Sequence, residues 1–253
     1  MPALDLPDPP WVVGHRGVRG AAPENTVESV RQAVAQKADM VELDLQLTGD
    51  AELVVYHDLA FRISDEESKP VGQATLEEIK RGRPVWKRQG VELAYEIPTL
   101  DEVLAAAPAE LPLNLEIKRW DLRVDPAKLI EVLAKAIAGR ERILVSSFDG
   151  AVLTEVDKKI PQVLLAPLGG LGSEWNELVE LARGLDAFSI HIHRLLAASL
   201  GRKGVLEEPE AKERPILAYT VNKASEARKL LRLGLSGFFT DRPGELRDQL
   251  EGH

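Results

Sequence analysis

The sequence predicts an α/β fold, a TIM (β/α)8 barrel with an insertion after the second strand. Short apolar runs alternate with longer amphipathic segments along the whole chain, which is the pattern of repeated βα units around a parallel sheet. About eight of these runs are strand candidates. The length of 253 residues also fits, because one α/β barrel often takes roughly 200 to 250 residues. We therefore expect a single domain over residues 1–253.

Each predicted strand is a short apolar run followed by polar or turn residues. In chain order the predicted strands are Trp11–Gly14, Met40–Leu45, Leu113–Ile117, Ile143–Ser146, Gln162–Ala166, Ala187–Ile190, Ile216–Tyr219 and Gly237–Thr240. Helical periodicity follows at Asn25–Gln36, Leu100–Ala107, Pro126–Ala138, Gly150–Lys158, Glu174–Arg183, Ala224–Leu233 and Pro243–Leu250. The helix between the sixth and seventh strands is poorly marked.

One segment interrupts the alternation of strands and helices. Glu52–Tyr56 predicts an extra short strand, and residues 59–97 are long, charged and irregular. We interpret 59–97 as an insertion between the second strand and its helix. Insertions at the carboxyl end of a barrel commonly build or cover the active site, since catalytic residues come from the strand ends there.

Composition excludes several classes of protein. The formal net charge of −9 argues against nucleic acid or an anionic membrane as the main partner. With no cysteine, the chain has neither a disulfide framework nor a thiolate metal site. The first ten residues contain two acids, no base and no apolar run, and no segment approaches the roughly 20 apolar residues of a membrane span. We therefore expect a cytoplasmic protein without stable membrane insertion.

Three carboxylates are placed where a barrel binds its ligand. Glu42 and Asp44 are two residues apart on a predicted strand, so they point to the same face. The same alternation places Asn114, Glu116 and Lys118 on one face of the next barrel strand. Buried carboxylates need a cation, and a hard divalent metal with oxygen ligands is the natural candidate. A salt bridge to Arg or Lys is the alternative.

Two of the five histidines end short apolar runs. His15 follows Trp11–Gly14, and His57 follows the extra strand. A histidine at the carboxyl rim of a barrel points into the ligand cavity, and its near-neutral pKa suits proton transfer. A hydrogen-bonded structural histidine is the alternative at each position. His191 and His193, at the end of the sixth strand, are candidates either for substrate contact or for a structural role.

A phosphodiester fits this set of residues. Its cleavage needs a Lewis acid and fixed positive charge near the phosphoryl oxygens, with one group to activate the nucleophile and another to protonate the leaving oxygen. The carboxylates, the two histidines, Arg16 and Lys118 match these needs. The phosphate-binding loop G-x-x-x-x-G-K-[ST], the HExxH helix and the G-x-S-x-G elbow are all missing from the sequence. Nucleotide-triphosphate and serine-hydrolase chemistry are therefore disfavoured.

The order of these motifs resembles the glycerophosphodiester phosphodiesterase family. The resemblance begins with His15-Arg16-Gly17, Pro23-Glu24-Asn25-Thr26, Glu42-x-Asp44 and His57-Asp58. It continues through Ile97-Pro98-Thr99-Leu100-Asp101-Glu102, Glu116-Ile117-Lys118, Ser147-Phe148, Thr220-Val221-Asn222 and Thr240-Asp241-Arg242-Pro243. It thus covers nearly the whole chain, and as an ordered set it is specific.

The resemblance implies metal-dependent hydrolysis of glycerophosphodiesters to sn-glycerol 3-phosphate and an alcohol. By position, it implies that Glu42, Asp44 and Glu116 bind Mg²⁺ or Ca²⁺ and that His15 and His57 are the acid/base pair. Arg16 and Lys118 would hold the phosphate, and Phe148 and Tyr219 would shape the cavity wall. Glu24 and Asn25 would organise the first loop, and Asn25 or Thr26 is also a candidate helix cap.

The sequence departs from the family pattern at several places. Tyr219 stands where the family has tryptophan, Leu59–Ser64 lacks the usual Arg-Thr-Thr, and Gly49–Glu52 replaces an Asp-Gly turn. None of these is a proposed ligand or proton carrier, so they affect the expected substrate rather than catalysis. Two alternatives remain: a phosphodiesterase for lysophospholipid or sphingolipid headgroups, working through water or a cyclic phosphate, and a catalytically silent barrel that binds a phosphate ligand.

Overall fold

Eight parallel strands close into a barrel, which confirms the predicted fold class. The computed structural model describes residues 4–63, 67–88, 90–118 and 125–252. The barrel strands, in their order around it, are β1 (Trp11–Gly14), β2 (Met40–Leu47), β8 (Leu113–Ile117), β9 (Ile143–Ser147), β10 (Leu164–Gly169), β11 (Ile190–His193), β12 (Ile216–Tyr219) and β13 (Gly237–Thr240). Pairing of β1 with both β13 and β2 closes the ring.

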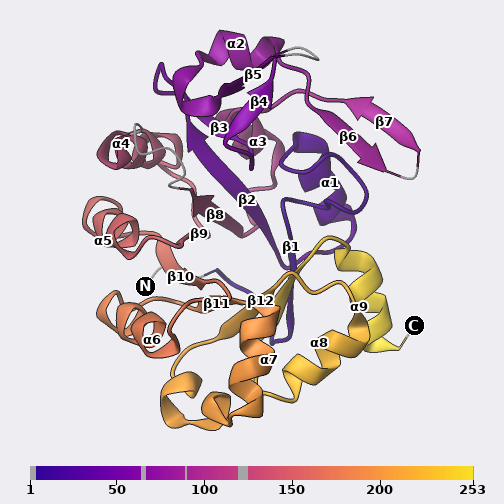
Figure 1. Cartoon of the computed structure of the whole chain (residues 1–253), viewed down its shortest axis with the longest axis vertical. Coiled ribbons are helices and arrows are strands. Elements are labelled where there is room, and N and C mark those ends of the chain that lie inside the picture. Colours follow the sequence, from indigo (N-terminus) through magenta and orange to yellow (C-terminus); the bar gives the residue numbers. More distant parts are fainter. Residues whose placement is uncertain (1–3, 64–66, 89, 119–124, 253) are drawn as a thin grey trace.

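Helices follow the strands and surround them (Figure 1). They are α1 (Val27–Ala35), α3 (Leu100–Ala106), α4 (Pro126–Ala136), α5 (Gly150–Lys159), α6 (Trp175–Gly184), α7 (Arg194–Arg202), α8 (Ala224–Leu231) and α9 (Pro243–Glu251), with short 3-10 turns at Val205–Glu207 and Pro209–Lys212. Thr26 and Thr99 begin their helices with capping boxes, in which the threonine hydroxyl accepts from the N3 backbone N–H. Thr26, rather than Asn25, therefore caps the first helix. None of the described helices is both long and apolar enough to cross a lipid bilayer.

The sixth barrel strand is shifted along the chain from its predicted position. The prediction ended it at Ile190, whereas β11 runs from Ile190 to His193. The prediction missed most of β11 because His191 and His193 alternate with its apolar residues, whereas a barrel strand is normally recognised by a run of apolar residues. The poorly marked helix after it is α7, which begins directly at Arg194.

The inserted segment is more regular than its composition predicts. Between β3 (Leu53–Val55) and α3 the described residues form the hairpin β4 (Ala60–Arg62) with β5 (Ser68–Pro70), a 3-10 turn (Val71–Gln73), the helix α2 (Leu76–Arg81) and the hairpin β6 (Val85–Arg88) with β7 (Val91–Ala94). Figure 1 shows these elements gathered on one side of the barrel. They enclose an apolar cluster of their own, made by Val54, Tyr56, Phe61, Val71, Ala74, Ile79 and Ile97.

Side-chain alternation divides the barrel interior into an apolar floor and a polar top. On β1, Trp11 and Val13 belong to the interior apolar cluster. On β2, Met40 belongs to the same cluster, and Glu42 and Asp44 follow on the same face. The intervening residues Val41, Leu43 and Leu45 pack outwards in the larger core under the helices. The polar groups are thereby collected at the carboxyl ends of the strands.

Candidate active site

A cavity of about 310 Å³ opens at the carboxyl end of the barrel. Eight of the nine predicted site residues line it: His15, Arg16, Glu42, His57, Glu116, Lys118, Phe148 and Tyr219. The ninth, Asp44, is 1% exposed and lies beside Glu42 and Glu116 at the edge of the same space. The structure thus brings together residues that are spread over more than 200 positions of the sequence.

The three carboxylates form one cluster. Each of Glu42, Asp44 and Glu116 offers an oxygen within 4.8 Å of the others. Burial, and then the neighbouring carboxylates, raise the pKa of Glu42 well above its usual value. Its Oε2 accepts from the backbone N–H of Arg16 at 2.9 Å, but its buried Oε1 has no hydrogen-bond partner among the described residues. Several buried carboxylate oxygens around one point are what a hard divalent cation requires, so the cluster is compatible with such a site.

The salt bridges that were the alternative explanation for these acids are also present. Lys118 Nζ lies 3.0 Å from Asp44 Oδ1 and 2.7 Å from Glu116 Oε1. Arg16 Nε lies 3.1 Å from Asp44 Oδ2. Burial raises the pKa of Asp44, but the charges of Arg16 and Lys118 outweigh that effect and hold its pKa below the usual value. Asp44 is therefore ionised and neutralised by protein cations, whereas one oxygen of Glu42 has no partner among the residues that the structure describes.

His15 is oriented by a chain of hydrogen bonds that the sequence did not reveal. Its Nδ1 donates to Asp241 Oδ1 at 2.8 Å, and Asn222 Nδ2 donates to Asp241 Oδ2 at 2.7 Å. Burial lowers the pKa of His15, and the hydrogen bond to Asp241 offsets part of this shift. With the proton held on Nδ1, Nε2 is left as the nitrogen for proton exchange in the cavity.

His57 is held by the short segment that follows β3. Its Nδ1 donates to Asp58 Oδ1 at 2.8 Å. Gln46 Nε2 donates to the carbonyl oxygens of Tyr56 at 2.7 Å and of Asp58 at 2.8 Å, and so fixes the backbone on both sides of the histidine. Sequence reasoning missed Gln46, although it continues the alternation of Glu42 and Asp44 along β2 and was detectable by that signal.

The first loop is built around Asp44 and Arg16. Asn25 Nδ2 donates to Asp44 Oδ2 at 2.7 Å, and Asp44 N–H donates back to Asn25 Oδ1 at 3.1 Å. Glu24 accepts from an Arg16 terminal nitrogen at 2.6 Å. Asn25 and Glu24 therefore connect this loop to the acidic cluster.

The opposite wall of the cavity is aromatic and apolar. Phe148 and Tyr219 meet edge to face with ring centroids 6.2 Å apart, and Leu168 and Phe239 complete this wall. The Tyr219 hydroxyl donates to the Gly169 carbonyl oxygen at 2.8 Å. Charged groups thus come from β1, β2, β8 and the segment after β3, and apolar groups come mainly from the other half of the barrel.

The two remaining histidines of β11 differ from each other. His193 packs against Tyr219 and accepts the Leu195 N–H at 3.2 Å, at the start of α7. His191 is 0% exposed and does not line the cavity, and its Nε2 pairs with the Ser189 hydroxyl at 2.9 Å. Burial lowers the pKa of His191 to about 3, so it is a neutral residue of the barrel interior.

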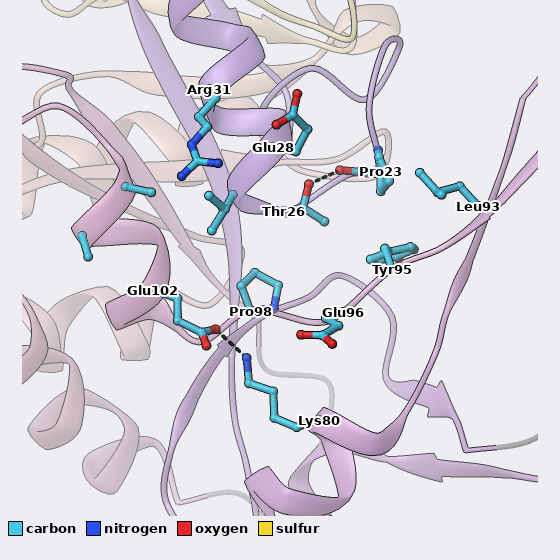
Figure 2. Close-up of a pocket in the computed structure, with 13 residues that line it drawn as sticks. Pro23, Thr26, Glu28, Arg31, Lys80, Leu93, Tyr95, Glu96, Pro98 and Glu102 are labelled. Atoms are coloured by element: carbon cyan, nitrogen blue, oxygen red, sulfur yellow. Dashed lines mark hydrogen bonds and ion pairs between the residues drawn. The ribbon is translucent and has the colours of Figure 1, made fainter.

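A larger cavity of about 660 Å³ lies between α1, the insertion and α3 (Figure 2). Figure 2 shows Arg31 entering it from α1 and Lys80, which pairs with Glu102, from the opposite wall. The described residues that line it include none of the nine predicted site residues, and the acidic cluster is not among them. The smaller cavity, and not the larger one, is therefore the candidate active site.

Comparison with known proteins identifies the family of this chain. The Glycerophosphoryl diester phosphodiesterase family matches residues 15–245. A glycerophosphodiester phosphodiesterase from Caldanaerobacter subterraneus subsp. tengcongensis is 32% identical over 243 residues, which cover 93% of this chain and 95% of the relative. A putative glycerophosphodiester phosphodiesterase from Bacillus subtilis is 29% identical over 240 residues, covering 92% of this chain and 95% of the relative.

Solved structures give the same result. A phosphodiesterase from Oleispira antarctica, in complex with the product sn-glycerol-3-phosphate, has a TM-score of 0.78 at 27% identity and covers 96% of this chain and 97% of its own. A glycerophosphodiester phosphodiesterase from Thermotoga maritima has a TM-score of 0.75 at 26% identity and covers 94% of this chain and 97% of its own. The chain therefore belongs to the glycerophosphoryl diester phosphodiesterase family of enzymes.

Proposed function

We propose that the protein hydrolyses glycerophosphodiesters to sn-glycerol 3-phosphate and an alcohol, with a bound Mg²⁺ or Ca²⁺ and with His15 and His57 as the acid/base pair. One observation carries the proposal: the carboxylate cluster, with the unpartnered Glu42 Oε1, lies in the same cavity as two imidazoles whose Nδ1 atoms are both held by carboxylates. The relative from Oleispira antarctica, bound to sn-glycerol-3-phosphate, supports a small phosphate ester as the ligand.

Glu42, Asp44 and Glu116 would hold the divalent cation. A cation bound there supplies Lewis-acid stabilisation of negative charge on a phosphoryl oxygen. Arg16 and Lys118 add positive charge beside the same oxygens while they neutralise Asp44.

The two imidazoles exchange protons with the substrate. One takes a proton from the attacking oxygen as the new P–O bond forms, and the other gives a proton to the leaving alcohol oxygen as the old P–O bond breaks. The two Nδ1 hydrogen bonds keep Nε2 of each ring available for these transfers.

Release of glycerol 3-phosphate from glycerophosphocholine and glycerophosphoethanolamine tests this function. We expect no release after treatment with a chelator and recovery when Mg²⁺, Ca²⁺ or Mn²⁺ is returned, because the carboxylates alone cannot stabilise the phosphoryl charge. Time-resolved product analysis separates direct attack by water from attack by a substrate hydroxyl, which leaves a transient cyclic ester. Binding of a glycerophosphodiester without turnover in any of the three metals would contradict the proposal and indicate a silent binding protein.

A lysophospholipid is a second candidate substrate, favoured by exposed apolar side chains that follow the carboxyl ends of neighbouring barrel strands; one of them, Phe148, lines the cavity. Phe148, Leu171 and Leu195 are 53%, 63% and 47% exposed and follow the ends of three successive strands, β9, β10 and β11. The Phe148 ring lies 3.9 Å from the position of a Cβ on Gly170, so it adjoins the loop that carries Leu171. An apolar surface that begins at Phe148 in the cavity wall would bind a hydrocarbon chain attached to the phosphodiester.

Chain-length dependence tests this second candidate. The ratio of kcat/KM for 1-octanoyl-glycerophosphocholine to that for glycerophosphocholine is expected to fall about tenfold in the double variant Leu171→Asn, Leu195→Asn, since about 1–2 kcal/mol of apolar contact is lost. Val34→Asn, at an exposed apolar position on α1, is the control and should leave the ratio unchanged. A wild-type enzyme that does not cleave the octanoyl compound would remove this candidate without affecting the first.

A further inference from the structure

Asn114 is a buried amide that makes no hydrogen bond with the described part of the chain. It is 1% exposed, and neither its Nδ2 nor its Oδ1 has a partner there. Buried amides are almost always hydrogen-bonded, because losing water without a replacement costs free energy. The side chain lines the candidate active site together with Glu42 and Glu116. Its amide therefore faces a ligand space rather than a packed interior.

The strand register places Asn114 against the acidic cluster from two directions. In the pairing of β2 with β8, Asn114 is the direct neighbour of Glu42, and Glu116 is the direct neighbour of Asp44. Residues directly opposite on adjacent strands project to the same side, and so do residues two apart on one strand. Asn114 thus lies beside Glu42 across the strands and beside Glu116 along β8.

Glu42 and Asn114 each have a buried side-chain oxygen that accepts no hydrogen bond from the described residues. These oxygens are Glu42 Oε1 and Asn114 Oδ1, and the two residues are directly paired across β2 and β8. A cation, or a water bound to it, placed between Glu42 and Asn114 would give both oxygens a partner. Three carboxylates also leave coordination positions open, because Mg²⁺ takes six oxygen ligands and Ca²⁺ takes about six to eight.

We propose that Asn114 is part of the divalent-metal site, its Oδ1 entering the coordination sphere directly or through one metal-bound water. This inference rests on the proposed function, since it concerns the same cation. Asn114 acts here as a positioning and ligand residue without exchanging protons. The neutral oxygen adds a ligand without adding a fourth negative charge to a cluster that already contains three carboxylates.

Isothermal titration calorimetry with Mg²⁺, Ca²⁺ and Mn²⁺ on the metal-free protein tests the proposal. Asn114→Leu keeps the number and branching of the side-chain heavy atoms and removes both polar atoms, and it is expected to weaken the affinity about 10- to 100-fold, the usual effect of losing a supporting group at a metal site. Asn114→Asp keeps an oxygen at the same place and is expected to bind at least as tightly as the wild type. The thermal shift produced by the metal should follow the same order.

His191→Leu is the matched control, because it also replaces a buried side chain that has an unpartnered atom, His191 Nδ1, on a strand away from the cluster. It should leave the metal affinity unchanged. Melting curves of the metal-free variants show whether they fold. Asn114→Leu removes a buried amide without a partner among the described residues and should not lower Tm, whereas His191→Leu also removes the partner of the Ser189 hydroxyl and should lower it slightly.

Three other outcomes would contradict, respectively, the role of Asn114, the assignment of its Oδ1 and the presence of a metal. Affinity of Asn114→Leu within threefold of the wild type would overturn the proposal. An equal loss in Asn114→Asp and Asn114→Leu would show that the amide N–H is needed and would overturn the assignment of Oδ1. A wild-type protein that binds none of the three cations would instead refute the metal in the proposed function.

Discussion

Replacement of His15 by alanine is expected to lower kcat by about 10²–10⁴, the contribution of a positioned general acid or base. His15 lines the candidate active site, and Asp241 holds its Nδ1 at 2.8 Å. His57→Ala should cause a loss of the same size, because the reaction needs both a proton acceptor and a proton donor. Steady-state kinetics with glycerophosphocholine and a saturating metal concentration measure both effects.

Asp241→Asn tests whether Asp241 raises the pKa of His15. The hydrogen bond from His15 to Asp241 raises the pKa of His15 against the larger effect of burial. Without the carboxylate the pKa should fall further, so the limb of the pH–rate profile that depends on His15 should move to lower pH. The direction is the same whether His15 is the acid or the base. If His15 is the general acid, the rate falls as the pH rises through the pKa of His15. If His15 is the general base, the rate falls as the pH decreases through that pKa.

Controls separate catalysis from folding. His191→Leu changes a histidine outside the cavity and should retain near wild-type turnover. Circular dichroism should show that the His15 and His57 variants remain folded. Near-full turnover of folded His15→Ala or His57→Ala would contradict the acid/base assignment of that residue, and an unmoved pH profile in Asp241→Asn would show that Asp241 does not tune His15.

Asp44→Asn is expected to abolish metal binding and, with it, turnover. Asp44 is 1% exposed, accepts from Asn25 Nδ2 and forms ion pairs with Arg16 and Lys118. Neutralising it removes a proposed metal ligand and one counter-charge from each of these two cations, which keep Glu24 and Glu116 respectively. Breaking a buried ion pair in this way costs about 3–5 kcal/mol, which adds a loss of stability to the loss of metal. Calorimetry for metal affinity and thermal melting measure the two effects separately.

Glu116→Gln distinguishes metal loss from unfolding. Glu116 is 13% exposed on its side chain and pairs with Lys118, so its neutralisation disturbs fewer buried charges than Asp44→Asn does. We expect weakened metal affinity, with activity partly restored by excess metal, in a protein that melts near the wild-type temperature. Glu52→Gln, at an exposed carboxylate, is the matched control. A folded Asp44→Asn protein that keeps both its metal affinity and its activity would refute the carboxylate site.

Local sequence patterns were sufficient to predict the barrel and to select most of the residues that line the candidate active site. The alternation of apolar runs with amphipathic segments specifies βα units, and about eight such units in a chain of this length are typical of a closed (β/α)8 barrel. The period-two alternation of β2 and β8 placed Glu42, Asp44 and Glu116 on inward faces before any contact was known. His15 and His57 were identified because each ends a short apolar run: His15 follows the barrel strand β1, and His57 follows the extra strand β3.

Only the tertiary structure decided how these residues are held. Asp241 lies 226 positions from His15, and the two meet because β13 pairs with β1 when the ring closes. Asn25 caps no helix and instead binds Asp44, and Arg16 and Lys118 neutralise that carboxylate from two strand ends. The two hairpins of the insertion were also unpredicted, since their strands are short and charged. Sequence periodicity reports which face of an element a side chain occupies, whereas the partner across the barrel depends on long-range closure, which has no local signal.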